Sequence, residues 1–159
     1  MVLIPSRELS PILLIDIDHT IYDAFWRDPM IAEGNWDHYH EMGAYDEAFV
    51  ETVALIKGLH MAGWWIVALT ARPEKWRKAT MDKMLGDNIA VDELVMRPVD
   101  NFMPTEKLKV HLVGELFSDD EISRIQFIID DHDGVIAAFK TMGIHGLRIH
   151  AVTLGEPNA

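Results

Sequence analysis

The 159-residue sequence contains no cysteine, which excludes disulfide frameworks, cysteine-ligated zinc, iron–sulfur clusters and cysteine nucleophiles. It also lacks any apolar run near the roughly 20 residues that a membrane span needs. The first ten residues lack the hydrophobic stretch of a signal peptide. Basic residues are scarce: 14 Lys and Arg face 26 Asp and Glu, for a formal net charge of −12. We therefore expect a cytoplasmic protein that binds neither anionic membranes nor long nucleic acids.

Five short apolar runs alternate with segments of helical periodicity, and no repeat or linker divides the sequence. The predicted strands are 12–17, 64–69, 94–96, 125–129 and 147–152. The predicted helices are 46–61, 74–85, 105–117 and 133–142. This alternation predicts an α/β fold, Rossmann-like, with a doubly wound parallel sheet of about five strands. We expect a single domain over residues 1–159.

Residues 19–45, here called the flap, do not follow this alternation. They hold six of the 14 aromatic residues, and a long insertion in a compact domain is usually functional. We interpret the flap as a minimal cap, since no segment is long enough for a full cap domain. Trp26, Trp36 and Tyr39 are candidates for stacking on a base of the substrate. The simpler interpretation, for most of the flap rings, is a small satellite core.

Polar residues follow the predicted strands where ligands bind in doubly wound sheets, beyond the carboxyl ends. The acids expected at this edge are Asp16, Asp18, Asp130 and Asp131, and the other candidates are Thr20, Thr70, Ala71, Arg72, Arg97, Lys107 and Lys109. Asp16 and Asp18 point to the same side of an extended segment and repel each other unless a cation or proton joins them. Four carboxylates make an oxygen-rich site suited to Mg²⁺, which leaves coordination positions for phosphate oxygens. The set therefore predicts phosphoryl transfer.

The order of these residues resembles the four motifs of the haloacid dehalogenase superfamily over about residues 12–150. The motifs are Asp16-Ile17-Asp18-His19-Thr20, then Thr70, then Lys109, then Asp130-Asp131. A narrower resemblance is to the phosphatase domain of polynucleotide kinase/3′-phosphatases. It rests on Thr70-Ala71-Arg72-Pro73-Glu74, Arg97, Pro104-Thr105-Glu106-Lys107-Leu108-Lys109 and Ile128-Ile129-Asp130-Asp131, with His19 where glycine is usual and His132 where arginine is common. The sequence contains no G-x-x-x-x-G-K-[ST] motif, so a kinase half is absent.

The resemblance implies a two-step phosphatase. Asp16 would be the nucleophile that forms an aspartyl-phosphate, and Asp18 would protonate the leaving oxygen and then activate water. The ligands implied for Mg²⁺ are the Asp16 carboxylate, the backbone carbonyl of Asp18 and a carboxylate of the Asp130-Asp131 pair. We favour Asp131 as the ligand and Asp130 as the partner of the lysine. Thr70 and Lys109, or alternatively Lys107, would stabilise the phosphoryl charge, and Thr20, Ala71, Arg72 and Arg97 are expected to contact substrate.

The predicted substrate is a nucleotide, either a nucleoside monophosphate or the 3′-phosphate of a short nucleic-acid end. Residues 72–109 hold eight basic residues against seven acids, whereas the rest of the chain has six against 19. Basic residues thus gather beside the phosphate motifs. The alternatives are another phosphorylated metabolite, a phosphoprotein, or a non-enzymatic binding module. A small substrate would need a site closed by the flap or by a second subunit, which leaves a homo-oligomer open.

Overall fold

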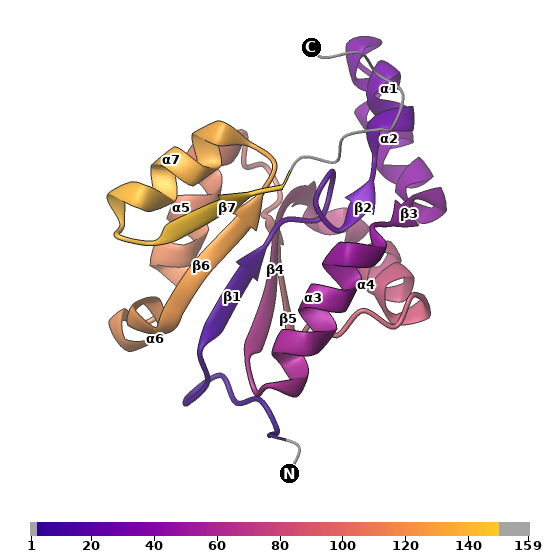
Figure 1. Cartoon of the computed structure of the whole chain (residues 1–159). Coiled ribbons are helices and arrows are strands. Elements are labelled where there is room, and N and C mark those ends of the chain that lie inside the picture. The colour runs from indigo at the N-terminus through magenta and orange to yellow at the C-terminus, as the bar shows by residue number, and fades with distance from the viewer. Residues whose placement is uncertain (1–2, 150–159) are drawn as a thin grey trace.

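The computed structural model describes residues 3–149, and its centre is a five-stranded parallel sheet. The strands, in spatial order, are β5 (Glu93–Arg97), β4 (Trp65–Pro73), β1 (Ile12–Ile15), β6 (Ile125–Asp130) and β7 (His145–Arg148). The chain runs outward from β1 through β4 and β5, then crosses back to β6 on the other side of β1 (Figure 1). The predicted fold class is confirmed. This order places the crevice of a doubly wound sheet at the carboxyl end of β1.

Helices cover both faces of the sheet because the strands are apolar on both faces (Figure 1). On one side lie α3 (Val50–Met61) and α4 (Arg77–Gly86), and on the other lie α5 (Thr105–Leu116) and α7 (Asp133–Thr141). Successive β1 side chains enter opposite cores. Leu14 packs in the cluster that contains Leu108 and Phe139, whereas Leu13 packs in the cluster that contains Ile56 and Met84. Every β1 side chain is fully buried, which fixes the register that positions the following residues.

Three predicted boundaries differ from the structure near the site. Strand β4 continues past residue 69 to Pro73, so Thr70 and its neighbours belong to the strand itself. The helix predicted from residue 46 begins only at Val50, because Phe49 is extended and its N–H donates to the Ile21 carbonyl at 2.9 Å. The segment predicted as the start of the helix at 74 is a 3₁₀ turn, η3 (Glu74–Trp76), that leads into α4.

Two further differences lie far from the site. The sequence analysis missed α6 (Asp119–Arg124), although its signal was readable. Ser118 accepts from the Glu121 N–H, and the Glu121 side chain accepts from the Ser118 N–H, which is a capping box. The last strand was predicted as 147–152 and lies at His145–Arg148, and residues 150–152 of that prediction fall outside the described residues.

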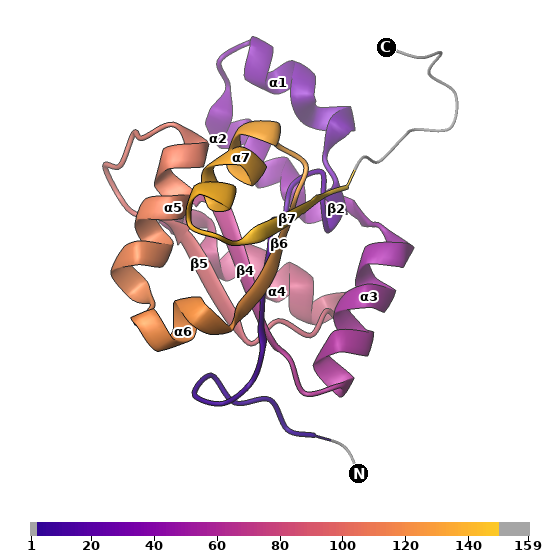
Figure 2. The ribbon, with the colours of Figure 1, turned by 60° about the vertical axis from the view of Figure 1, so that its left-hand side comes forward.

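The flap is a set of short helices carried on a two-stranded hairpin. β2 (Tyr22–Asp23) pairs antiparallel with β3 (Glu47–Ala48), so the insertion closes slightly later than residue 45. Between them come η1 (Phe25–Arg27), α1 (Asp28–Ala32), α2 (Trp36–Met42) and η2 (Gly43–Tyr45). Figure 2 shows α1 and α2 beyond the carboxyl ends of the central strands. The flap thus stands over the edge where the candidate residues gather.

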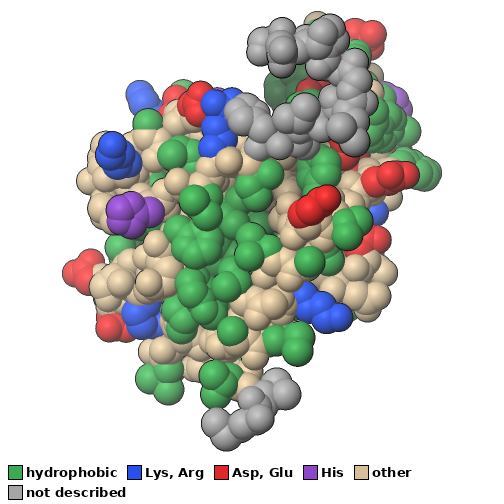
Figure 3. All heavy atoms as spheres, viewed as in Figure 1, with side chains coloured by type: hydrophobic (Ala, Val, Ile, Leu, Met, Phe, Trp, Pro, Cys, Tyr) green, Lys and Arg blue, Asp and Glu red, His purple; other side chains and the backbone are tan. Residues whose placement is uncertain are grey.

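One face of the molecule carries a patch of hydrophobic side chains (Figure 3). Figure 3 shows hydrophobic side chains gathered at the centre of one face, over β1 and β6, between the two groups of helices. Within residues 3–149, no helix has the length and apolar character that crossing a membrane requires.

Candidate active site

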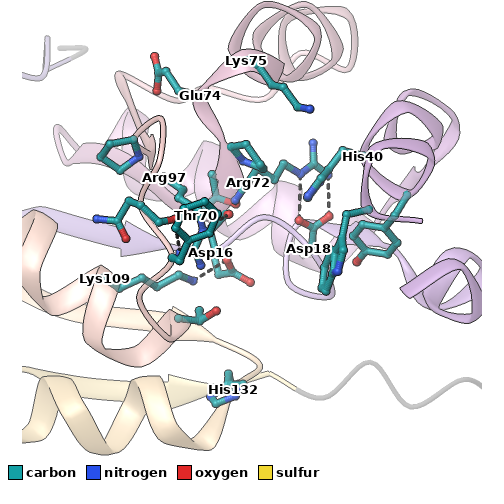
Figure 4. Close-up of a pocket in the computed structure, with 18 of the residues that line it drawn as sticks. Asp16, Asp18, His40, Thr70, Arg72, Glu74, Lys75, Arg97, Lys109 and His132 are labelled. Atoms are coloured by element: carbon teal, nitrogen blue, oxygen red, sulfur yellow. Dashed lines mark hydrogen bonds and ion pairs between the residues drawn. The ribbon is translucent and has the colours of Figure 1, made fainter. Parts of the chain in front are cut away.

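A buried lysine joins two carboxylates at the carboxyl ends of β1 and β6. The Nζ atom of Lys109 lies 2.6 Å from Asp16 Oδ1 and 2.6 Å from Asp130 Oδ2 (Figure 4). Lys109 and Asp130 are each 1% exposed, and Asp16 is 6% exposed. Lys107 is exposed to solvent, because residues two apart on a helix face different directions. The geometry therefore selects Lys109 over Lys107, and it pairs Asp130 with the lysine.

Three carboxylates meet around this lysine. Oxygen atoms of Asp16, Asp130 and Asp131 all lie within 4.8 Å of one another. Burial raises the pKa of Asp16 to about 6, with Lys109 opposing and Asp130 adding to the effect. Burial and the charge of Asp16 also raise the pKa of Asp131. Three acids against one lysine leave excess negative charge among hard oxygen ligands, and such a donor set fits Mg²⁺.

The Asp18 carboxylate turns away from these acids toward two arginines. Arg72 donates two hydrogen bonds to it, from Nε to Oδ2 at 2.9 Å and from Nη2 to Oδ1 at 2.7 Å (Figure 4). Arg27 of the flap donates to the same Oδ1. Burial acts to raise the pKa of Asp18, but Arg72 and Arg27 outweigh it and hold that pKa well below its usual range. In this arrangement Asp18 is ionised, so it can accept a proton and holds none to donate.

Arg27 and Asp46 are site residues that the sequence analysis missed. Arg27 is fully buried, and its guanidinium lies between Asp18 and Asp46, with Nη2 to Asp46 Oδ2 at 2.6 Å. It also donates to the Tyr39 carbonyl at 2.9 Å. The sequence offered one signal. Residues 19–51 contain eight Asp and Glu but a single Lys or Arg, which is Arg27. This buried network ties the flap to the sheet edge where the candidate residues gather.

The residues predicted to contact substrate differ in what surrounds their side chains. Thr70 and Ala71 line the cavity of the site, and Thr20 donates to Asp16 Oδ2 at 3.4 Å. Arg72 and Arg97, each expected to contact substrate or a second polar group, also line the cavity, and both guanidinium groups bind protein atoms. Arg97 donates to the carbonyls of Ala71, Asn101 and Met103, at 3.1, 3.1 and 2.7 Å. Its observed role is to shape the loop that follows β5.

The two flap tryptophans differ in position. Trp36 lines the cavity, whereas Trp26 does not, and Trp26 Nε1 instead donates to Asp46 Oδ1 at 2.9 Å. The satellite core expected for most of the flap rings is wrong for four of six, since Phe25, Trp26, Trp36 and Tyr45 are exposed. The reason is that the buried side chain of Arg27, with Tyr22 and Tyr39, fills the interior under the flap.

His19 has a left-handed backbone, with φ of 62°. This conformation explains the glycine that the resemblance places here, because a Cβ costs about 1–2 kcal/mol in that region. Contacts of the ring offset this cost: its centroid lies 4.1 Å from that of Phe25, and Nε2 lies 3.1 Å from Asp28 Oδ1.

Asp18, Lys109 and the three acids around it border one cavity of about 840 Å³. Part of its wall is Lys109 with Asp16, Asp130 and Asp131, here called the acid–lysine cluster. Other parts come from the flap and from the loop after β5. The flap contributes His19, Ile31, Trp36, Tyr39 and His40, and the loop contributes Pro98, Val99, Asp100, Asn101 and Phe102. The cavity thus opens the buried cluster to a molecule considerably larger than phosphate.

Known structures share this architecture, although no protein-family model matches the sequence and no curated protein matches it either. A chain of the Pnkp1/Rnl/Hen1 RNA repair complex superposes with a TM-score of 0.75 at 18% identity, covering 94% of this chain and 45% of that one. The protein thus spans about half the length of that chain.

Two further neighbours are hydrolases. A haloacid dehalogenase-like family hydrolase from Streptococcus pneumoniae has a TM-score of 0.60 at 12% identity, covering 87% of this chain and 84% of its own. A class C acid phosphatase from Bacillus anthracis, solved with tungstate bound, has a TM-score of 0.55 at 16% identity, covering 77% and 52%. At these identities the likeness establishes architecture, and the protein has the α/β fold of the haloacid dehalogenase-like proteins.

Proposed function

We propose that the protein is a Mg²⁺-dependent phosphomonoesterase that works through an aspartyl-phosphate. One observation carries the proposal: Asp16 lies in a cluster with Lys109, Asp130 and Asp131 that lines the cavity. A carboxylate that is held by a lysine and has two further acids beside it is suited to attack a phosphoryl group next to a divalent cation.

The proposed reaction has two steps. An Asp16 carboxylate oxygen forms a bond to phosphorus while the bond from phosphorus to the ester oxygen breaks. The leaving oxygen takes a proton from Asp18, which has itself taken one from solvent after its arginine contacts loosen. Water then attacks the same phosphorus, the bond to Asp16 breaks, and phosphate leaves. Lys109 holds the carboxylate in place, and the Thr70 hydroxyl donates to a phosphoryl oxygen. Bound Mg²⁺ would be held by Asp16 and Asp131 with the carbonyl of Asp18, and it supplies charge stabilisation.

Asp18 is the proposed proton carrier, and its contacts constrain when it acts. As a carboxylate held by Arg27 and Arg72, it is ready to take a proton from the attacking water. Protonation of the leaving oxygen by Asp18 requires these contacts to loosen once substrate is bound, because a carboxylate held by two guanidinium groups keeps no proton.

The proposed substrates are nucleotides, either a nucleoside monophosphate or a short nucleic-acid 3′ end. The Pnkp1/Rnl/Hen1 neighbour, an RNA repair complex, supports an end-processing role. The acidic flap, with one arginine against eight acids in residues 19–51, disfavours a long polynucleotide across it.

A substrate panel tests this function. Phosphate release in the presence of Mg²⁺ is measured with nucleoside 3′- and 5′-monophosphates, a 3′-phosphorylated oligonucleotide, sugar phosphates and a phosphopeptide. The proposal expects the highest kcat/KM on nucleotides. Turnover of none of these substrates would overturn the phosphatase, and preference for sugar phosphates or the phosphopeptide would overturn only the nucleotide assignment.

Mg²⁺ is expected to stabilise the folded protein through Asp131. At a concentration about 100-fold above its Kd, a ligand of the native state adds about 2.7 kcal/mol, or roughly 5 °C or more in Tm. Asp131→Asn should lose most of this shift in differential scanning fluorimetry. Asp133→Asn is the matched control, since Asp133 is an exposed acid paired with Arg148. An equal Mg²⁺ shift in both variants would contradict the assigned ligand.

The Mg²⁺ shift should also depend on pH. The pKa of Asp16 is about 6 in the metal-free protein, above its usual value, so the native state holds an extra proton between about pH 4 and 6. The metal must displace that proton. The Tm gain from Mg²⁺ should therefore be full at pH 7.5 and shrink as the pH falls through 6. A gain that is constant from pH 7.5 to 5 would contradict ligation by Asp16.

A further inference from the structure

The cavity has room for much more than the phosphoryl group. Its volume of about 840 Å³ lies in the range of pockets that enclose whole small molecules. Figure 4 shows the acid–lysine cluster on one side of Asp18 and His40 of the flap on the other. The group that carries the phosphate must therefore meet the wall that the flap provides.

That wall is aromatic. Trp36 and His40 lie four residues apart on α2, so they share a helix face. Their rings are stacked, with centroids 6.2 Å apart and planes inclined by 28°. Tyr39 meets both rings edge-on, at 5.9 and 5.2 Å. Trp36 remains 53% exposed while lining the cavity, so part of its ring is free to contact a ligand.

The wall also carries an unpaired polar atom. His40 Nδ1 is buried and has no hydrogen-bond partner among the described residues. Burial lowers the pKa of His40 to about 4, so the ring is neutral near pH 7. The Nδ1 atom itself is closed off from solvent, so His40 meets a ligand through the part of its neutral ring that lines the cavity. A ligand with a flat face suits this wall.

Two contacts position the wall relative to the edge that carries Asp16 and Asp18, before the contacts of Asp18 loosen for proton transfer. Arg27 binds Asp18 and also donates to the Tyr39 carbonyl of α2. Lys75, from η3, forms an ion pair with Asp37 of the same helix. Fixed aromatic groups bind a ligand with little loss of conformational entropy.

We propose that Trp36 and His40 form a nucleobase subsite that selects a nucleotide carrying its base beside the scissile phosphate. Sugars need several hydroxyl partners, and the flap wall is built from Ile31 and the rings of His19, Trp36, Tyr39 and His40. The subsite takes one base, because the acidic flap disfavours a longer strand. This inference rests on the proposed phosphatase function and specifies its substrate.

Binding tests the subsite independently of turnover. In an Asp16→Asn background with Mg²⁺, calorimetry gives the Kd of a nucleoside monophosphate and of the ribose phosphate that lacks the base. Adding Trp36→Ala should weaken nucleotide binding about tenfold and leave ribose phosphate within about twofold. Trp36→Phe should recover most of the loss, since it keeps a ring. His40→Ala should also weaken the nucleotide selectively.

Tyr45→Ala is the matched control, because Tyr45 is a 72% exposed flap ring that does not line the cavity. It should change neither Kd. The subsite is overturned if Trp36→Ala weakens the binding of both ligands equally or of neither. It is also overturned if the protein with an unsubstituted flap binds both ligands with the same Kd. Failure of the phosphatase itself appears separately, as absence of turnover by the wild-type chain in the substrate panel.

Discussion

Asp16→Asn is expected to reduce phosphate release by roughly 10³-fold or more, the scale seen when an enzyme loses its nucleophile. Asn has the same shape and still lies within reach of Lys109, so the fold and the cavity should persist. The side-chain amide, however, is a far poorer nucleophile than a carboxylate. Steady-state phosphate release from a nucleoside monophosphate measures the effect, and circular dichroism confirms the fold.

The matched control for this variant is Asp23→Asn, an acid of the flap hairpin that does not line the cavity. It should retain activity within about twofold, as surface substitutions usually do. Phosphate release by Asp16→Asn within tenfold of the wild type would show that another group attacks phosphorus, and the mechanism would be wrong.

Lys109→Met is expected to cost the metal-free protein about 3–5 kcal/mol of unfolding free energy at pH 8. Met nearly matches the length of lysine but leaves Asp16 and Asp130 buried with no cation between them. The cost should shrink at pH 5, because protonation removes the uncompensated charge. Mg²⁺ should return part of the loss, since it supplies positive charge at the same place. Urea denaturation at the two pH values measures these differences.

Lys107→Met provides the comparison for that experiment, because Lys107 is exposed two residues earlier on the same helix. It should change stability by less than about 0.5 kcal/mol. If Lys109→Met lost no more stability than Lys107→Met, or lost the same amount at both pH values, the lysine would not be balancing the two carboxylates.

The sequence was sufficient for the sheet and for the acid–lysine cluster because both depend on local patterns. Apolar runs identified the strands, and the residues that follow parallel strands must meet at one edge. Asp16, Asp130 and Lys109 therefore converge as expected. Even the pairing of Lys109 with Asp130 was predicted, although only through resemblance to a known family.

The flap was predictable only as an insertion. Its interior depends on Arg27 contacting Asp46, 19 residues away, and Asp18, nine residues away, which no helical or strand period encodes. The same limit applies to the two tryptophans: Trp36 faces the cavity and Trp26 turns to Asp46 because of how the short helices pack. Nor could the sequence show that Asp18 is held by two arginines, which decides its charge.

The central claim is that Asp16 carries the phosphoryl group during the reaction. It is tested most directly by acid-quenching the protein within milliseconds of mixing with nucleotide and Mg²⁺, then locating the reduced residue in its peptides by mass spectrometry after borohydride reduction. The aspartyl-phosphate mechanism predicts reduction of the acyl-phosphate at residue 16 to homoserine, and none in Asp16→Asn. Turnover without modification at residue 16, or modification at another residue, would contradict it.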